Sequence, residues 1–93
     1  MTTPDKELYE KAIEKWGNDL QEIVMIEEMS ELTKQICKRL RGNSSIENLD
    51  KITEEMADVE IMLEQMKIVY KNEDHVREAK KMKLDRLEKL VYG

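Results

Sequence analysis

Residues that break helices stand at only a few places in this chain, and this sparseness constrains the fold more than any other feature. The 93 residues include one Pro and three Gly. Glu, Lys, Leu, Met and Ile dominate between the breaks, and these are strong helix formers. Because the apolar residues recur at helical intervals, they can be buried together despite the high charge. The sequence therefore predicts an all-α protein, organised as one domain over residues 1–93.

The breaks delimit a short N-terminal helix and three amphipathic helices. Gly17, Gly42 and Asn72 provide the stops, while Asn18 or Asp19 is placed to cap the second helix. A capping box of Ser44 with Glu47 is predicted to open the third. The expected helices are residues 5–16, 18–41, 45–70 and 74–91.

The second helix has two apolar stripes, which one short chain can scarcely cover. The first stripe is Met25, Met29, Leu32, Ile36 and Leu40, and the second begins with Leu20, Ile23 and Val24. A chain of this length builds only a thin core, so association is the default expectation. We expect a homo-oligomer, either a dimer or a tetramer, in which partner chains complete a helical bundle.

The charge is uneven along the chain and excludes some partners. The net charge is −5, which disfavours binding to a nucleic-acid backbone. Residues 76–91 hold six basic and three acidic side chains, so this segment is +3 and the remainder −8. No membrane span or signal peptide is evident, and the single Cys37 suits a reducing compartment. A cytoplasmic protein with a basic last helix that could face an anion is expected.

Acidic residues interrupt positions where apolar ones are expected. On the second helix, the stripe begun by Leu20 turns into Glu27, Glu28 and Glu31. On the third helix, Glu55 and Asp58 share an arc with apolar residues. Ionised carboxylates in such a setting cost several kcal/mol unless they are paired or bind a metal.

Two acid pairs on successive helices favour a cation site. Glu28 with Glu31, and Glu55 with Asp58, are each three residues apart and could converge across an antiparallel helix pair. Without a His partner, a di-iron or zinc site is disfavoured, and all-oxygen ligation suits Mg²⁺, with Mn²⁺ as an alternative. The plainer interpretation is a solvated acidic face, which single acid pairs usually represent.

These residues also form a recognisable pattern. EEMSE from Glu27 to Glu31, then EMAD from Glu55 to Asp58, resembles the EExxE and ExxD motifs of the MazG-type all-α nucleoside triphosphate pyrophosphohydrolases. KWGND, beginning at Lys15, is similar to the segment before the first motif in compact, phage-like members. Lys83-Leu84 with Arg86 resembles their basic last helix, although Lys81 stands where many members carry Asn.

The resemblance implies Mg²⁺-dependent hydrolysis of a nucleoside triphosphate, usually a deoxynucleotide, to monophosphate and pyrophosphate. It implies that Glu28, Glu31, Glu55 and Asp58 are the metal ligands, while Glu27 would orient or deprotonate the attacking water. Trp16 could stack on the base, or could equally be a core or interface residue. Candidate phosphate-binding residues are Lys34, Lys38, Lys83 and Arg86.

Two other interpretations stay open at the level of the sequence. The chain could be a non-catalytic, oligomeric helical interaction module whose acids and lysines only keep a Met-rich assembly in solution. Alternatively, the same fold and metal could serve a different substrate, since phosphoribosyl-ATP pyrophosphohydrolases and dimeric dUTP hydrolases share related helical scaffolds.

Overall fold

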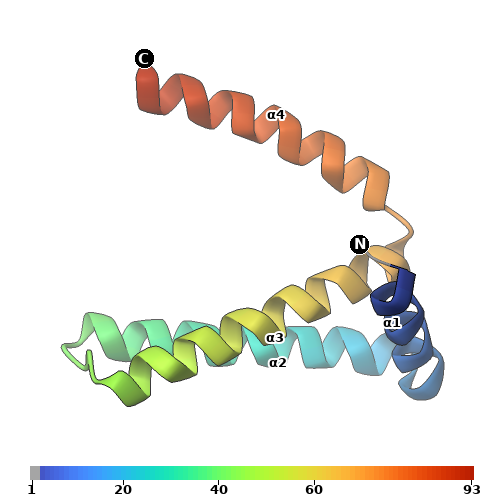
Figure 1. Ribbon diagram of the computed structural model, residues 1–93, viewed down its shortest axis with the longest axis horizontal. Coiled ribbons are helices and arrows are strands. Elements are labelled where there is room, and N and C mark those ends of the chain that lie inside the picture. Colours follow the sequence, from blue (N-terminus) through green and yellow to red (C-terminus); the bar gives the residue numbers. More distant parts are fainter. Residues whose placement is uncertain (1–2) are drawn as a thin grey trace.

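Four α-helices account for nearly all of the chain (Figure 1). The computed structural model describes residues 3–93. The helices are α1 (Thr3–Trp16), α2 (Asn18–Leu40), α3 (Ile46–Tyr70) and α4 (Glu73–Tyr92). The predicted all-α architecture with a short first helix is therefore confirmed, and the helix ends lie within about two residues of those expected from the sequence.

The glycines end helices for the reason that the sequence indicates, but the predicted caps differ in detail. Gly17 has a φ of 87° and Gly42 a φ of 104°, values that favour residues without a Cβ. The predicted capping box is wrong by one residue, because Ser45, and not Ser44, precedes α3. The Ser45 hydroxyl oxygen accepts a hydrogen bond from the backbone N–H of Asn48 at 3.1 Å. Neither Asn18 nor Asp19 caps α2, which directly follows Gly17.

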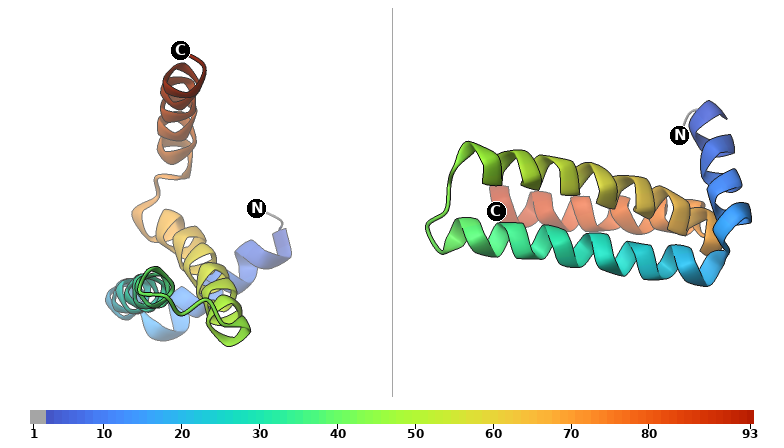
Figure 2. Two further views of the ribbon diagram at one scale, coloured as in Figure 1. Left: turned by 90° about the vertical axis from the view of Figure 1, so that its left-hand side faces the viewer. Right: turned by 90° about the horizontal axis from the view of Figure 1, so that it is seen from below.

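The antiparallel pair of α2 and α3 forms the body of the molecule, hereafter the hairpin (Figures 1 and 2). Its core consists of Met25, Met62 and Met66, the buried hydrophobic residues within residues 3–93, and each of them keeps 5–9% of its surface exposed. Three valines pack partly buried against them, namely Val24, Val59 and Val69. Flexible methionines suit the irregular space between two helices, yet so few buried residues make a thin core. α1 crosses the end of the hairpin and contacts both of its helices.

α4 departs from this body. It packs on α3 only near its own beginning and then projects away, so that it and the hairpin enclose an open V (Figure 1). None of its residues is buried. The Cα radius of gyration is 16.0 Å, whereas a compact chain of this length would have roughly 12 Å. The single copy is therefore an open shape with much of its apolar surface uncovered.

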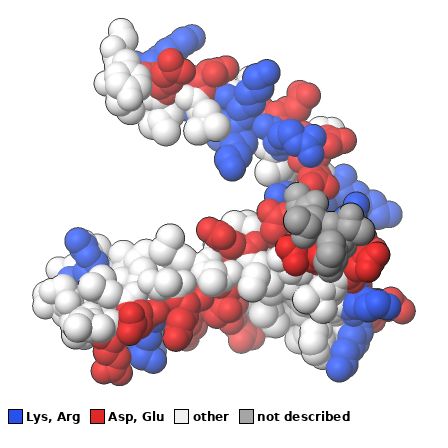
Figure 3. Space-filling view, viewed as in Figure 1, with Lys and Arg blue, Asp and Glu red and all other residues white. Residues whose placement is uncertain are grey.

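The hairpin has two chemically different sides, and helical spacing separates them. Acidic side chains follow one side, which Figure 3 shows as the lower edge. The other side, toward α4, is mostly uncharged. We call it the apolar side, and its residues, each 40–71% exposed, are Ile26, Met29, Ile36, Leu40, Leu49, Met56 and Leu63. Despite this exposed apolar surface, no helix in the described part of the chain has an apolar stretch that could cross a bilayer.

Candidate metal centre

Three carboxylates from two helices converge on the acidic side of the hairpin. Glu28 comes from α2, and Glu55 and Asp58 come from α3. One oxygen atom of each lies within 4.8 Å of the others. Glu28 and Glu55 are half-buried and Asp58 is exposed. We call this group the acid triad. The three-residue spacing places Glu55 and Asp58 on one face of α3, and antiparallel packing brings Glu28 opposite them.

No basic side chain compensates the acid triad. The ion pairs within residues 3–93 are Lys67 with Glu64, and Arg77 with both Glu73 and Asp74, all of them away from the triad. The Oε2 atom of Glu55 is buried and has no hydrogen-bond partner. A buried carboxylate oxygen without a partner carries a desolvation cost that a bound cation would offset.

The triad changes the acidity of one of its members. Burial raises the pKa of Glu28 from its ordinary 4.5 to about 7, and hydrogen bonds to Asp58 and Glu55 with repulsion from their charges add to the effect. Three neighbouring carboxylates without a cation therefore retain a proton near neutral pH. A divalent ion is the natural replacement for that proton, because it neutralises the charge that the proton otherwise removes.

Buried amides flank the triad on both sides and fix the register of the two helices. Toward α1, the Gln21 side-chain N–H donates to the Gln65 side-chain oxygen at 2.6 Å. Toward the connecting loop, the Asn48 side-chain N–H donates to the Gln35 backbone and side-chain oxygens at 3.2 and 3.1 Å. All four residues are buried. Each stands seven residues from a triad member, which is two helical turns on the same face.

The sequence pattern did not single out these amides as site residues. The signal that could have found them is the seven-residue spacing, which joins Gln21, Glu28 and Gln35 on α2. A slipped register would separate Glu28 from its partners on α3. The amides therefore act as positioning residues for the acid triad.

The other predicted acidic residues lie beside the group. Glu31 is exposed on the next turn of α2 and is outside the set of converging oxygens. Glu27 is exposed and lies about 100° around the helix from Glu28. Lys51, which the sequence pattern also left unassigned, is exposed one turn before Glu55 on the same side of α3. Its ammonium would be available to an anion at the triad.

The structure does not bring the remaining predicted substrate-binding residues to the triad. Lys34 is exposed and Lys38 half-buried on α2, toward the connecting loop. Lys83 and Arg86 are exposed on α4, which projects from the opposite side of the hairpin. Trp16 is 51% exposed at the end of α1, and Glu28 lies about 15 Å along α2 from the first residue of that helix. Its ring contacts its neighbour instead, with the Lys15 ammonium 5.1 Å from the ring centroid.

The donors of the triad suit one class of ion. All are carboxylate oxygens, as hard cations prefer, and no imidazole or thiolate accompanies them in the group. Solvent access at Asp58 leaves room for water or an anionic ligand to complete the coordination. The residues present therefore fit Mg²⁺ or Mn²⁺ better than Zn²⁺.

Comparison with protein-family models, with curated proteins and with solved structures finds no match to this chain. The chain is an all-α protein with an acid triad suited to binding a divalent metal ion.

Proposed function

We propose that this chain is a Mg²⁺-dependent nucleoside triphosphate pyrophosphohydrolase in which Glu28, Glu55 and Asp58 hold the metal. One observation carries the proposal, namely the approach of three carboxylates to within 4.8 Å of one another with no basic side chain to compensate them. The EExxE and ExxD spacing supports it, because the triad joins one residue of the first motif to both acids of the second. Mn²⁺ would suit the same oxygens.

A polyphosphate substrate explains why so many carboxylates would serve a site for an anion. The triad and a triphosphate repel each other, so binding requires a cation between them. Bound Mg²⁺ would neutralise that charge and lower the pKa of a coordinated water. The surrounding residues then have separate tasks. Glu31 would complete the ligand set from the exposed turn of α2, and Glu27 would orient or deprotonate the attacking water.

Basic residues on the acidic side would hold the outer phosphates. Lys34 and Lys38 on α2 and Lys51 on α3 lie toward the connecting loop, on the helices that carry the triad. Lys83 and Arg86 would reach the same nucleotide only from a neighbouring copy, because α4 projects from the other side of the hairpin. Trp16 would contact the base only if the nucleotide extended along α2 toward α1.

The chemistry favours direct attack by water on the α-phosphorus. Glu28, Glu55 and Asp58 are accompanied in their group by no Cys or His nucleophile, so a covalent intermediate on such residues is not expected. The bond between the α-phosphorus and the bridging oxygen breaks, and pyrophosphate leaves as one unit. The water oxygen ends in the monophosphate.

The decisive test is a panel of canonical and modified ribo- and deoxynucleoside triphosphates, assayed with Mg²⁺ in ¹⁸O-labelled water. We expect pyrophosphate release, label in the monophosphate, and loss of activity with chelator. Glu55→Gln should reduce turnover severely, whereas the matched change Glu78→Gln on exposed α4 should not. A nucleoside diphosphate with inorganic phosphate as first products would show that another bond is cleaved.

The same panel separates the alternatives. Release of pyrophosphate from phosphoribosyl-ATP or dUTP alone would keep the metal and the reaction but change the substrate. If every nucleotide is inert and Mg²⁺ fails to bind, the acids are a solvated face. The oligomeric interaction module then becomes the better interpretation.

A further inference from the structure

The junction between α3 and α4 is a connection of two residues, and neither residue is in a favourable conformation. Between residues 3 and 93, Lys71 is the only residue other than glycine with a positive φ, at 54°. A residue with a Cβ is strained in this left-handed region. The side chain of Asn72 makes no capping hydrogen bond to α4, although asparagine is a preferred N-cap, and its Oδ1 atom is buried without a partner. A change of backbone conformation would relieve both residues, as expected of a hinge.

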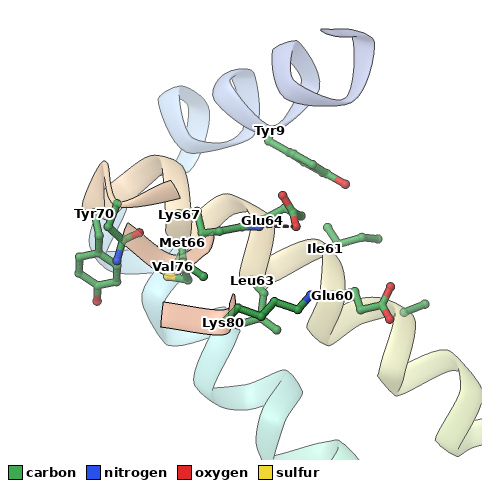
Figure 4. A pocket seen from close by; sticks show the side chains of 12 residues that line it. Tyr9, Glu60, Ile61, Leu63, Glu64, Met66, Lys67, Tyr70, Val76 and Lys80 are labelled. Carbon is green, nitrogen blue, oxygen red and sulfur yellow. Dashed lines mark hydrogen bonds and ion pairs between the residues drawn. The ribbon is translucent and has the colours of Figure 1, made fainter. Parts of the chain in front are cut away.

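The first turns of α4 contact the rest of the chain through one face of the helix. Val76 and Lys80 line a groove of about 740 Å³ together with residues of α1 and α3 (Figure 4). Leu84, Leu87 and Val91 continue the same face, because intervals of three and four residues keep side chains aligned along a helix. These three residues are more than half exposed. We call Val76, Leu84, Leu87 and Val91 the apolar face of α4. The face is thus directed toward the hairpin but contacts it only at the base of the V.

α3 offers a matching row of residues on the apolar side of the hairpin. Exposed apolar residues recur there at every seventh position, and each is 46–58% exposed, namely Leu49, Met56, Leu63 and Tyr70. Seven residues are about two helical turns, so these side chains form one row along α3. The apolar face of α4 has the same repeat between Leu84 and Val91. Two helices with a common seven-residue repeat can pack side by side along their length.

The short connection favours contact between α4 and its own hairpin. Helices joined by about two to five residues commonly pack as antiparallel neighbours. α4 already runs back from the junction toward the end of the molecule where the connecting loop of the hairpin lies (Figure 1). Attachment through a short linker gives α4 an effective concentration at its own hairpin of about millimolar. At micromolar protein concentration, contact within one copy is therefore favoured over contact with another copy.

Charge and surface area also favour this contact. The segment 76–91 is +3 and the rest of the chain is −8, so α4 is attracted to the body of the molecule. The open chain exposes 7600 Å², whereas a compact protein of 11.0 kDa would expose roughly 5,600 Å². Packing α4 along α3 would remove much of this excess, and the surface removed from water would be largely apolar.

We propose that α4 is a hinged lid, which closes about Lys71 and Asn72 so that its apolar face packs on the apolar side of its own hairpin. The V in Figure 1 is the open position of this lid. In the closed position both apolar surfaces are covered within one copy, so a partner chain can reach them only after the lid opens. The acid triad stays accessible in both positions, because it lies on the opposite side of α2 and α3. The lid therefore does not depend on the proposed enzymatic function.

The distance between two spin labels on one chain tests the lid. The labels are attached at Asn43→Cys in the connecting loop and at Lys89→Cys near the end of α4, in a chain whose own thiol is removed by Cys37→Ser. Pulsed electron paramagnetic resonance should give a short distance, that of packed helices whose axes lie about 8–10 Å apart. This distance should persist when the labelled chain is mixed with a roughly tenfold excess of unlabelled chain, because the contact is internal. A long distance alone would overturn the proposal. A short distance that disappears on mixing would also overturn it, and would assign the contact to two copies.

Paired variants of the labelled chain show which face of α4 makes the contact. Leu87→Glu should lower the ratio of closed to open chains at least about tenfold, because closure would bury a charge. Met82→Glu is the matched control, because Met82 is 73% exposed and lies on the opposite face of α4. Circular dichroism checks that each variant keeps its helices, and Leu84→Lys on the same face replaces Leu87→Glu if that variant does not fold. Loss of the short distance in both variants, or in neither, would show that the apolar face of α4 does not close on the hairpin.

Discussion

Glu28 holds its proton near neutral pH, so any metal ion at the acid triad must displace it. Its pKa of about 7 arises from burial and from the neighbouring Asp58 and Glu55. We expect Mg²⁺ affinity to fall by up to about tenfold per pH unit as the pH is lowered below 7, with a plateau near pH 8. Calorimetry in buffers of different ionisation enthalpy should detect proton release on binding. Equal affinity at about pH 6 and about pH 8 would contradict this prediction.

The same proton governs the stability of the metal-free protein. Between pH 4.5 and about 7 the folded chain retains a proton on Glu28 that the unfolded chain has lost. Glu28 therefore makes the free energy of unfolding fall as pH rises through this window, by up to about 1.4 kcal/mol per pH unit. Glu28→Gln should remove that slope and raise the melting temperature at alkaline pH without metal.

Bound Mg²⁺ should reverse the difference in melting temperature between Glu28→Gln and the unmodified chain. Mg²⁺ is expected to raise the melting temperature of the unmodified chain and to have little effect on Glu28→Gln, which lacks one of the ligands. Glu78→Gln removes the same charge from an exposed position of α4 and should behave like the unmodified chain. A metal-induced shift of equal size in all three proteins would place the ion elsewhere.

The amide pairs between α2 and α3 matter at the scale of the helices. Gln21→Ala should cost about 1–3 kcal/mol, because it leaves the buried Gln65 amide without its partner at 2.6 Å. Replacing Gln21 and Gln65 together by Leu should cost less than the single change. Urea unfolding of the single and double variants gives the coupling energy. Ser30→Ala removes only an exposed hydrogen bond to its own helix and should change stability by less than about 0.5 kcal/mol.

The helices could be predicted from the sequence, because Gly17 and Gly42 mark the ends of helices. Both adopt the positive φ that favours glycine. The sequence also predicted that Glu28 lies near Glu55 and Asp58, because helical spacing places these residues on the facing surfaces of two antiparallel helices. It could not separate Glu31 from this group, because the crossing of two helices decides which turns meet. Gln21 and Gln35 are polar, and polar residues on a helix usually face solvent. Their burial could not be predicted, because it depends on how the two helices cross.

The placement of α4 was beyond prediction for a different reason. Only its first turns contact the rest of the chain, where Val76 and Lys80 line a groove with residues of α1 and α3 (Figure 4). No residue of α4 is buried, so no intramolecular contact fixes the direction of the helix beyond these turns. Lys83 and Arg86, which the resemblance places at the phosphates, lie on α4, and α4 leaves the hairpin on the side away from the acids. Their contact with phosphate stays a prediction.

For the molecule as a whole, folding and association should be linked. If a partner chain covers the exposed apolar face of α4, formed by Val76, Leu84, Leu87 and Val91, the melting temperature must rise with protein concentration. Calorimetry over a roughly hundredfold concentration range measures this directly. Leu87→Glu should flatten the dependence, because it places a charge on this face. Met82→Glu should preserve it, because Met82 is 73% exposed and lies on the opposite face of α4. A melting temperature independent of concentration, together with a monomer mass, would show that no partner chain covers this face.

Because the hairpin has an acidic side and an apolar side, substitutions on the two sides should affect different properties of the protein. On α2, Glu28 and Met29 are neighbours in sequence but point about 100° apart, and on α3 Met56 and Asp58 diverge by about 160°. A complete scan of substitutions should therefore give two interleaved periodic sets of sensitive positions. One set would affect only metal-dependent properties, and the other only the mass of the assembly. Substitutions could then accumulate on one side of the hairpin and change one of these properties without changing the other.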